Sequence, residues 1–104
     1  LVMGSGSMTH NLAEFFGGER EPAPYVLEFS RWIEQQLERG DLAALLDYRA
    51  RAPHARRAHP TEEHFLPLFF ALGAAGEAWQ ADYLSREVMY GMLAMDSFTL
   101  DAAV

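Results

Sequence analysis

The sequence contains no cysteine and no lysine among its 104 residues. The absence of cysteine excludes disulfides and thiolate metal sites, and it makes a reducing, cytoplasmic compartment the expected one. All eight basic residues are arginines, and they stand against fifteen carboxylates, which gives a net charge of -7. We therefore expect no nucleic acid among the partners.

Long hydrophobic runs are missing as well. No apolar stretch approaches the roughly 20 residues of a membrane-spanning helix, and the first residues lack the basic and apolar regions of a signal peptide. We therefore expect no membrane association. Half of the residues are nevertheless hydrophobic, which suits one globular domain. A domain of this size buries only somewhat more than about 60% of its unfolded surface, so a homo-oligomer is one way to cover an exposed face.

The N-terminal residues predict the end of a strand. Leu1 to Met3 are typical of the tail of a buried parallel strand, and the Gly-Ser run at 4–7 permits a sharp turn at its carboxyl end. Three residues are few against the usual five or six of a strand, so we expect that an N-terminal part of the domain is absent. Ligands of open α/β sheets bind at the carboxyl ends of strands, which would place His10 at the mouth of the sheet.

Two helices are expected next. Apolar residues between 25 and 39 recur at spacings of three and four, which predicts an amphipathic helix that ends at Gly40. Asp41 is expected to cap a second helix. That helix should end by Ala52, because Pro53 disfavours the helical conformation before it.

A third helix is expected to begin at Thr61, a typical N-cap residue, with Glu62 and Glu63 in its first turn. Pro67 should kink this helix or delay its regular hydrogen bonding, and Gly76 marks its end. Residues 53–60 are predicted to be a polar connector, residues 77–90 have no clear pattern, and residues 92–100 are predicted to form a terminal strand. The expected fold is therefore α/β, with three helices flanked by a strand at each end.

The chemistry must come from histidines and carboxylates, and His10 and His64 stand out. Each follows a turn or cap that would place its imidazole at the edge of an apolar layer, where burial and nearby carboxylates can tune its pKa. From spacing alone, an ordinary capping histidine is the favoured interpretation of His64, and an ordinary loop histidine that of His10. A zinc site made of His54, His59 and His64 is a further alternative, although spacings of five do not suit two ligands on one helical face.

Other motifs give weaker signals. The Gly-Ser run lacks both the spacing of a dinucleotide-binding loop and the lysine of a P-loop. Ser5 or Ser7 beside His10 could act as a nucleophile, but the Gly-x-Ser-x-Gly pattern is not present.

Two segments carry a family resemblance. The sequence GSGSMTHNL at 4–12 and the sequence HPTEEHFLPL at 59–68 resemble segments of class III extradiol ring-cleavage dioxygenases of the DOPA-4,5-dioxygenase-like group. Shorter likenesses at 46–48, 71–74 and 92–98 follow in the same order. The resemblance implies that residues 1–104 are a single C-terminal segment of an extradiol dioxygenase-type α/β sandwich, a catalytic domain whose N-terminal part is absent.

The resemblance also implies a function. Enzymes of this group use non-haem Fe(II) to insert both atoms of O2 into a catechol-type diol, and the ring opens beside the two hydroxyls. His64 matches the C-terminal metal ligand. His10 matches the histidine that acts as acid and base, and it could touch the metal when no substrate is bound. Fe(II) is the expected cofactor, with Zn as a substitute, while Glu63 would at most orient a ligand and His54 and His59 receive no catalytic role.

The missing N-terminal portion qualifies this expectation. In the family it supplies two further histidine ligands, and a non-haem iron oxygenase needs about three protein ligands. The chain alone is therefore expected to be inactive if it is truncated. The alternative hypothesis is a non-catalytic, metal-binding or self-associating remnant of the family.

Overall fold

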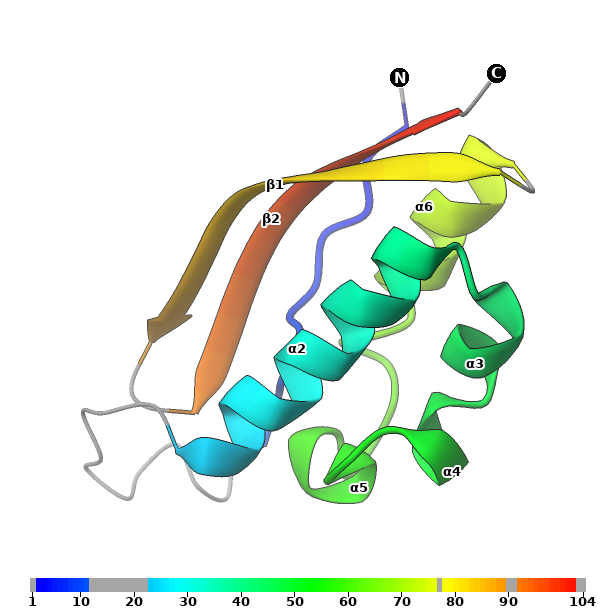
Figure 1. Ribbon diagram of the computed structural model, residues 1–104. Coiled ribbons are helices and arrows are strands. Elements are labelled where there is room, and N and C mark those ends of the chain that lie inside the picture. The colour runs from blue at the N-terminus through cyan, green and yellow to red at the C-terminus, as the bar shows by residue number, and fades with distance from the viewer. Residues whose placement is uncertain (1, 12–22, 77, 90–91, 103–104) are drawn as a thin grey trace.

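The computed structural model describes residues 2–11, 23–76, 78–89 and 92–102 (Figure 1). Helix α2, Pro24–Arg39, has the expected amphipathic character, and its buried side includes Val26, Phe29 and Ile33. It ends at Gly40, whose positive φ of 68° is a left-handed conformation that glycine adopts without steric cost. This helix was predicted correctly.

Two antiparallel strands form the sheet against which α2 packs. Strand β1, Trp79–Met89, pairs with β2, Leu93–Ala102, and both strands contact α2 (Figure 1). The indole Nε1 of Trp79 donates a hydrogen bond of 3.0 Å to the carbonyl of Leu37, which ties the start of β1 to the end of α2. The predicted terminal strand is confirmed as β2, while β1 lies in a region that the sequence pattern left without an element.

The described part of the chain also contains four short helices: α3 (Leu42–Leu46), α4 (Tyr48–Arg51), α5 (Ala55–Ala58) and α6 (Pro67–Ala75). Asp41 caps α3 as expected, since its side chain accepts a hydrogen bond of 3.0 Å from the Ala44 amide. The predicted second helix is interrupted at Asp47 and ends before Pro53, as expected. Within the described residues, no helix combines the length and the apolar character needed to cross a bilayer.

Three local predictions are wrong. The proposed polar connector contains α5. Thr61 caps no helix; its hydroxyl donates to the Glu63 carboxylate, and the helix begins instead at Pro67. Proline suits the first position of a helix because that position needs no N–H donor and the ring fixes a helical φ.

The predicted N-terminal strand is the third correction. Val2 and Met3 are exposed and belong to no strand, and Leu1 lies outside the described residues. Both strands of the described structure lie near the C-terminus, so the α/β class is confirmed but a strand at each end is not. The reason is a tertiary contact: the N-terminal backbone packs along the turn before α6, where the Ser7 amide donates to the His64 carbonyl at 2.9 Å.

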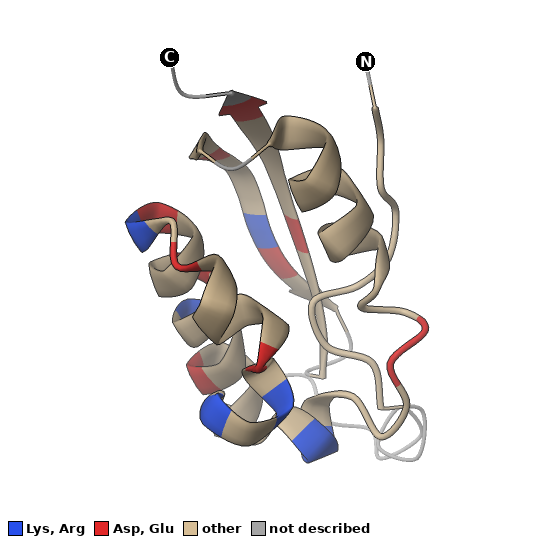
Figure 2. Ribbon diagram, turned by 90° about the vertical axis from the view of Figure 1, so that its right-hand side faces the viewer, with Lys and Arg blue, Asp and Glu red and all other residues tan. Residues whose placement is uncertain are grey.

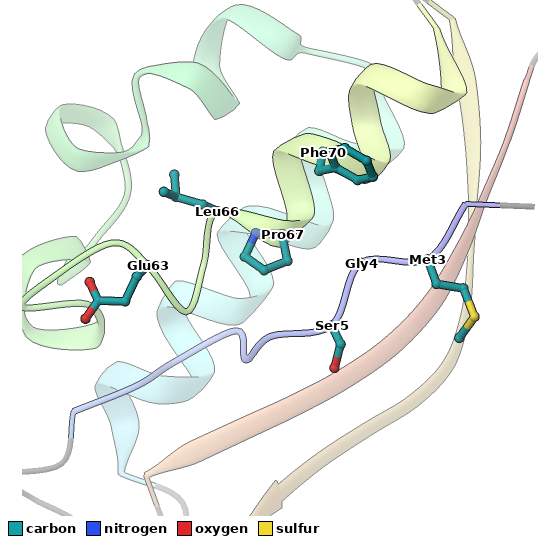
Figure 3. A pocket seen from close by; sticks show the side chains of 7 residues that line it. All are labelled: Met3, Gly4, Ser5, Glu63, Leu66, Pro67 and Phe70. Atoms are coloured by element: carbon teal, nitrogen blue, oxygen red, sulfur yellow. The ribbon is translucent and has the colours of Figure 1, made fainter.

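This packing requires glycine. A β-carbon on Gly6 would overlap the carbonyl oxygen of His64, and one on Gly4 would overlap that of Pro67. Figure 3 shows Gly4 and Ser5 running beside Pro67. The Gly-Ser run is therefore a site of close backbone approach.

The Gly6→Ala substitution should lower the free energy of unfolding by about 1–3 kcal/mol, because two backbone segments must separate to admit the methyl group. Gly73→Ala is the matched control, since a β-carbon there meets nothing within 4 Å. Alanine is the better helix former, so the control should be neutral or stabilising by up to about 1 kcal/mol. Chemical denaturation of both variants measures the difference, and equal effects would contradict the close approach.

Asp96 on β2 generates a second prediction. Burial, followed by the Glu34 carboxylate, raises the pKa of Asp96 to about 6, and the Arg86 guanidinium opposes this shift only in part. Arg86 pairs instead with Glu34, at 2.7 Å between Nε and Oε1. A carboxyl group whose pKa is raised on folding binds more protons in the folded state, so stability falls as pH rises between the unfolded and folded pKa values.

We expect Asp96→Asn to raise the free energy of unfolding at pH 7 by roughly 1–2 kcal/mol and to flatten its decline between about pH 4 and pH 6. Asp82→Asn on the exposed side of β1 is the control and should change stability by less than about 0.5 kcal/mol. Urea denaturation across this pH range measures the free energy of unfolding of both variants and of the unsubstituted protein. If Asp96→Asn lowers the free energy of unfolding at pH 7, the charged Asp96 carboxylate stabilises the folded protein and the prediction is wrong.

Candidate active site

The structure brings together the two histidines that sequence reasoning selected. The ring centroids of His10 and His64 lie 3.6 Å apart, and the rings are stacked with 16° between their planes. His10 is half-buried, whereas His64 is exposed. Two imidazoles from distant parts of the chain therefore share one place on the surface.

His10 is positioned by the backbone on both of its sides. The His10 amide donates to the Ala58 carbonyl at 2.7 Å, and the Asn11 side-chain amide donates to the Arg57 carbonyl at 2.8 Å. Just before His10, Thr9 is fully buried. The Thr9 hydroxyl donates to the Met92 carbonyl at 2.7 Å and accepts from the Ala94 amide at 2.8 Å. The histidine therefore stands on a segment held between β2 and the loop around α5.

His64 is held by its neighbours in the turn before α6. Its carbonyl accepts the hydrogen bond from Ser7, and the next residue, Phe65, is buried. The Phe65 ring packs against Tyr48 and His59, with a centroid distance of 4.6 Å to each. Aromatic packing of this kind fixes the turn, and the turn fixes the backbone of His64.

The charge state of the site follows from burial and proximity. Burial lowers the pKa of His10, the neighbouring His64 imidazole lowers it further, and the Glu63 carboxylate opposes both. Two stacked imidazoles disfavour simultaneous protonation, because like charges would then be in contact. His10 is therefore predominantly neutral at pH 7, which is the form that can accept a proton or bind a metal ion.

A shallow, open hollow lies between the N-terminal segment and the start of α6 (Figure 3). It is lined by Met3, Gly4, Ser5, Glu63, Leu66, Pro67 and Phe70. Glu63, which lines the hollow, precedes His64 in the chain, but neither imidazole lines it. The chemistry of the site resides in the imidazoles rather than in this mainly apolar hollow.

The donor set fits part of a metal centre. Neutral imidazole is a good ligand for iron and zinc, and His10 and His64 offer two such rings. No group of three or more histidines and carboxylates suited to hold a metal ion occurs among the described residues. The two imidazoles are therefore fewer than the roughly three protein ligands that a non-haem iron site needs.

The alternative zinc trio is not assembled. His54 Nε2 contacts the Glu28 carboxylate at 2.5 Å. His59 Nε2 instead contacts the Met8 carbonyl at 2.6 Å in the protein interior. His54 and His59 thus have separate partners, and His64 is stacked on His10.

Sequence reasoning missed the residues that hold this site in place. Thr9 and His59 are fully buried. Thr9 ties the segment that carries His10 to β2, His59 binds the Met8 carbonyl of that segment, and Gly6 permits the approach of the segment to His64. The sequence marks these residues only by their position in the two family-like segments. Gly6 and Thr9 belong to the first segment, and His59 is the first residue of the second.

Comparison with known proteins identifies the family of the chain. Residues 1–95 match the family described as the catalytic LigB subunit of aromatic ring-opening dioxygenase. Proteins named 4,5-DOPA dioxygenase extradiol are similar in sequence. The one from Beta vulgaris is 35% identical over 94% of this chain and 37% of its own length, and the one from Portulaca grandiflora is 36% identical over 94% and 36%.

More distant relatives extend the comparison to structure. The 4,5-DOPA dioxygenase extradiol of Escherichia coli K12 is 30% identical over 71% of this chain and 28% of its own length. The crystal structure of an uncharacterized protein from Escherichia coli K12 superposes with a TM-score of 0.73 and 26% identity, covering 90% of this chain and 40% of that one. The chain thus spans about a third of the length of the curated relatives it matches. By sequence and by fold, it belongs to the LigB family of aromatic ring-opening dioxygenases.

Proposed function

We propose that this chain is the C-terminal part of an extradiol dioxygenase that opens a catechol-type ring with O2, and that His10 and His64 are its contribution to the active site. The observation that carries the proposal is the stacking of these two imidazoles at 3.6 Å. The similarity to extradiol dioxygenases supports it. Because the chain spans only about a third of those relatives, the activity would belong to a larger assembly of the same family fold.

His64 is proposed to hold the metal ion. It is exposed, and its backbone is fixed by the turn before α6, so its ring can reach an ion without a change of fold. When bound, Fe(II) would supply the centre at which the diol and O2 are held together. Zn could occupy the same donors, but it has no redox chemistry of its own.

His10 is proposed to move protons. The lowered pKa leaves its imidazole neutral near pH 7, so it can accept a proton from a substrate hydroxyl and return it later in the reaction. The second imidazole beside it disfavours the charged state of His10, which helps the proton to leave again. His10 would also be within reach of the ion when no substrate is present, because it is stacked on His64.

A self-associating, non-catalytic remnant of the family is the second candidate, and one surface feature favours it. Helix α6 and the N-terminal segment carry no Lys, Arg, Asp or Glu (Figure 2). Met3, Leu66 and Phe70 are exposed there. Size-exclusion chromatography with metal analysis distinguishes this candidate, since it predicts a stable, metal-free oligomer.

The proposed roles predict different losses for His64→Ala and His10→Ala in the Fe(II)-loaded protein with its N-terminal portion. His64→Ala should abolish metal retention, because a ligand is removed. His10→Ala should keep the metal and slow turnover by about 10²- to 10⁴-fold, the usual contribution of a general acid–base. Oxygen uptake with a panel of catechols and metal content after gel filtration are the two measurements.

His54→Ala serves as the matched control, because His54 is exposed and pairs with Glu28 away from the two stacked rings. It should leave both measurements near the values of the unsubstituted protein. Loss of metal in His10→Ala with retention in His64→Ala would reverse the assignment. An unsubstituted protein with Fe(II) and no oxygen uptake on any catechol would remove the proposed function.

A further inference from the structure

His59 is the only buried one of the four histidines, with 0% of its surface exposed. Its ring packs against Phe65 at a centroid distance of 4.6 Å and against Phe29 at 5.6 Å. Burying an imidazole costs free energy unless its polar atoms are hydrogen-bonded. Among the described residues, the ring makes one hydrogen bond, and this bond shows which part of the protein His59 holds.

That bond runs from His59 Nε2 to the carbonyl oxygen of Met8, at 2.6 Å. A carbonyl can only accept, so Nε2 must carry the proton. Nδ1 is then the bare nitrogen, and it has no hydrogen-bond partner among the described residues. Burial lowers the pKa of His59 to about 4, so the ring is a neutral donor at ordinary pH.

The bond belongs to a clamp on the segment that carries His10. His59 holds the Met8 carbonyl, and the neighbouring Ala58 carbonyl accepts from the His10 amide at 2.7 Å. Between these two points, the Thr9 side chain is bound to β2. Residues 8–10 are therefore held on one side by residues 58–59 and on the other by the sheet.

We propose that His59 is a positioning residue, whose hydrogen bond to Met8 sets the place of the His10 imidazole against His64. Its consequence for turnover rests on the proposed function, whereas the positioning concerns the geometry of this chain alone. His59 touches neither substrate nor metal in this proposal. It acts only through the backbone of residues 8–10.

The test compares His59→Gln with His59→Met. Both side chains are unbranched and of similar size, but only glutamine keeps an N–H donor that can reach the Met8 carbonyl. His54→Gln and His54→Met, at the exposed histidine, are the matched controls. All four variants and the unsubstituted protein are compared by NMR and by oxygen uptake.

The NMR experiment follows the ring protons of His10 and His64, whose chemical shifts report on their stacking. In His59→Met these signals should move toward unstacked values, while the indole N–H of Trp79, bonded to Leu37, keeps its shift and shows that the fold is intact. In His59→Gln the stacked shifts should return. Unchanged His10 and His64 signals in a folded His59→Met protein would overturn the proposal.

Oxygen uptake with a catechol by the Fe(II)-loaded protein gives the functional consequence. In His59→Met we expect kcat to fall by about tenfold to a hundredfold with KM little changed, as displacement of a reacting group by about 1 Å would produce. His59→Gln should recover most of this loss. If the unsubstituted protein takes up no oxygen, the proposed function fails, and the positioning role is still decided by the NMR signals.

A measurement on the unsubstituted protein covers the case in which neither His59 variant folds. Long-range ¹H–¹⁵N correlation of the His59 ring should show a protonated Nε2, a bare Nδ1 and slow exchange of the Nε2 proton with solvent. A ring protonated at Nδ1, or one that exchanges rapidly, would exclude the bond to Met8 and with it the proposal.

Discussion

The arrangement of the site depends on one segment of backbone, residues 7–10, being bound at several points to the rest of the chain. The amides of Ser7, Met8 and His10 donate to the carbonyls of His64, Ala94 and Ala58, and the Met8 carbonyl accepts from the His59 ring. Each such bond contributes only about 0.5–1.5 kcal/mol, but a buried group left unbonded costs about 1–3 kcal/mol. The segment therefore has few alternatives to its observed position, and His10 has few alternatives to its place against His64.

Three of the four histidines differ in how deeply they are buried, and their expected roles differ with burial. His59 is fully buried and neutral, with one ring nitrogen committed to a backbone carbonyl. His10 is half-buried, and its lowered pKa keeps it neutral but reachable. His64 is exposed on a turn whose backbone is fixed by Phe65. From core to surface, the three imidazoles are thus a structural hydrogen-bond donor (His59), a proposed acid–base group (His10) and a proposed metal ligand (His64).

The fold was predictable where local signals agree with tertiary packing. Helix α2 has a clear apolar periodicity and a glycine stop, and β2 has extended-structure residues, so both were expected. The errors fall where tertiary contacts override local preference. Thr61 has the sequence context of an N-cap, but its hydroxyl bonds Glu63, and the backbone around His64 turns to meet Ser7 instead of forming a helix. The first three residues resemble a strand because they are apolar, yet Val2 and Met3 pair with no strand.

For the site, the sequence by itself determined which types of side chain are available for its chemistry. The absence of cysteine left histidine and carboxylate as the donors, and two family-like segments selected His10 and His64. Only the tertiary structure decided that these imidazoles meet, that His54 and His59 have other partners, and that Gly6, Thr9 and His59 hold the meeting place together. The physical reason is that hydrogen bonds and close approaches between residues far apart in the chain leave no periodic pattern in the sequence, whereas helices and strands do.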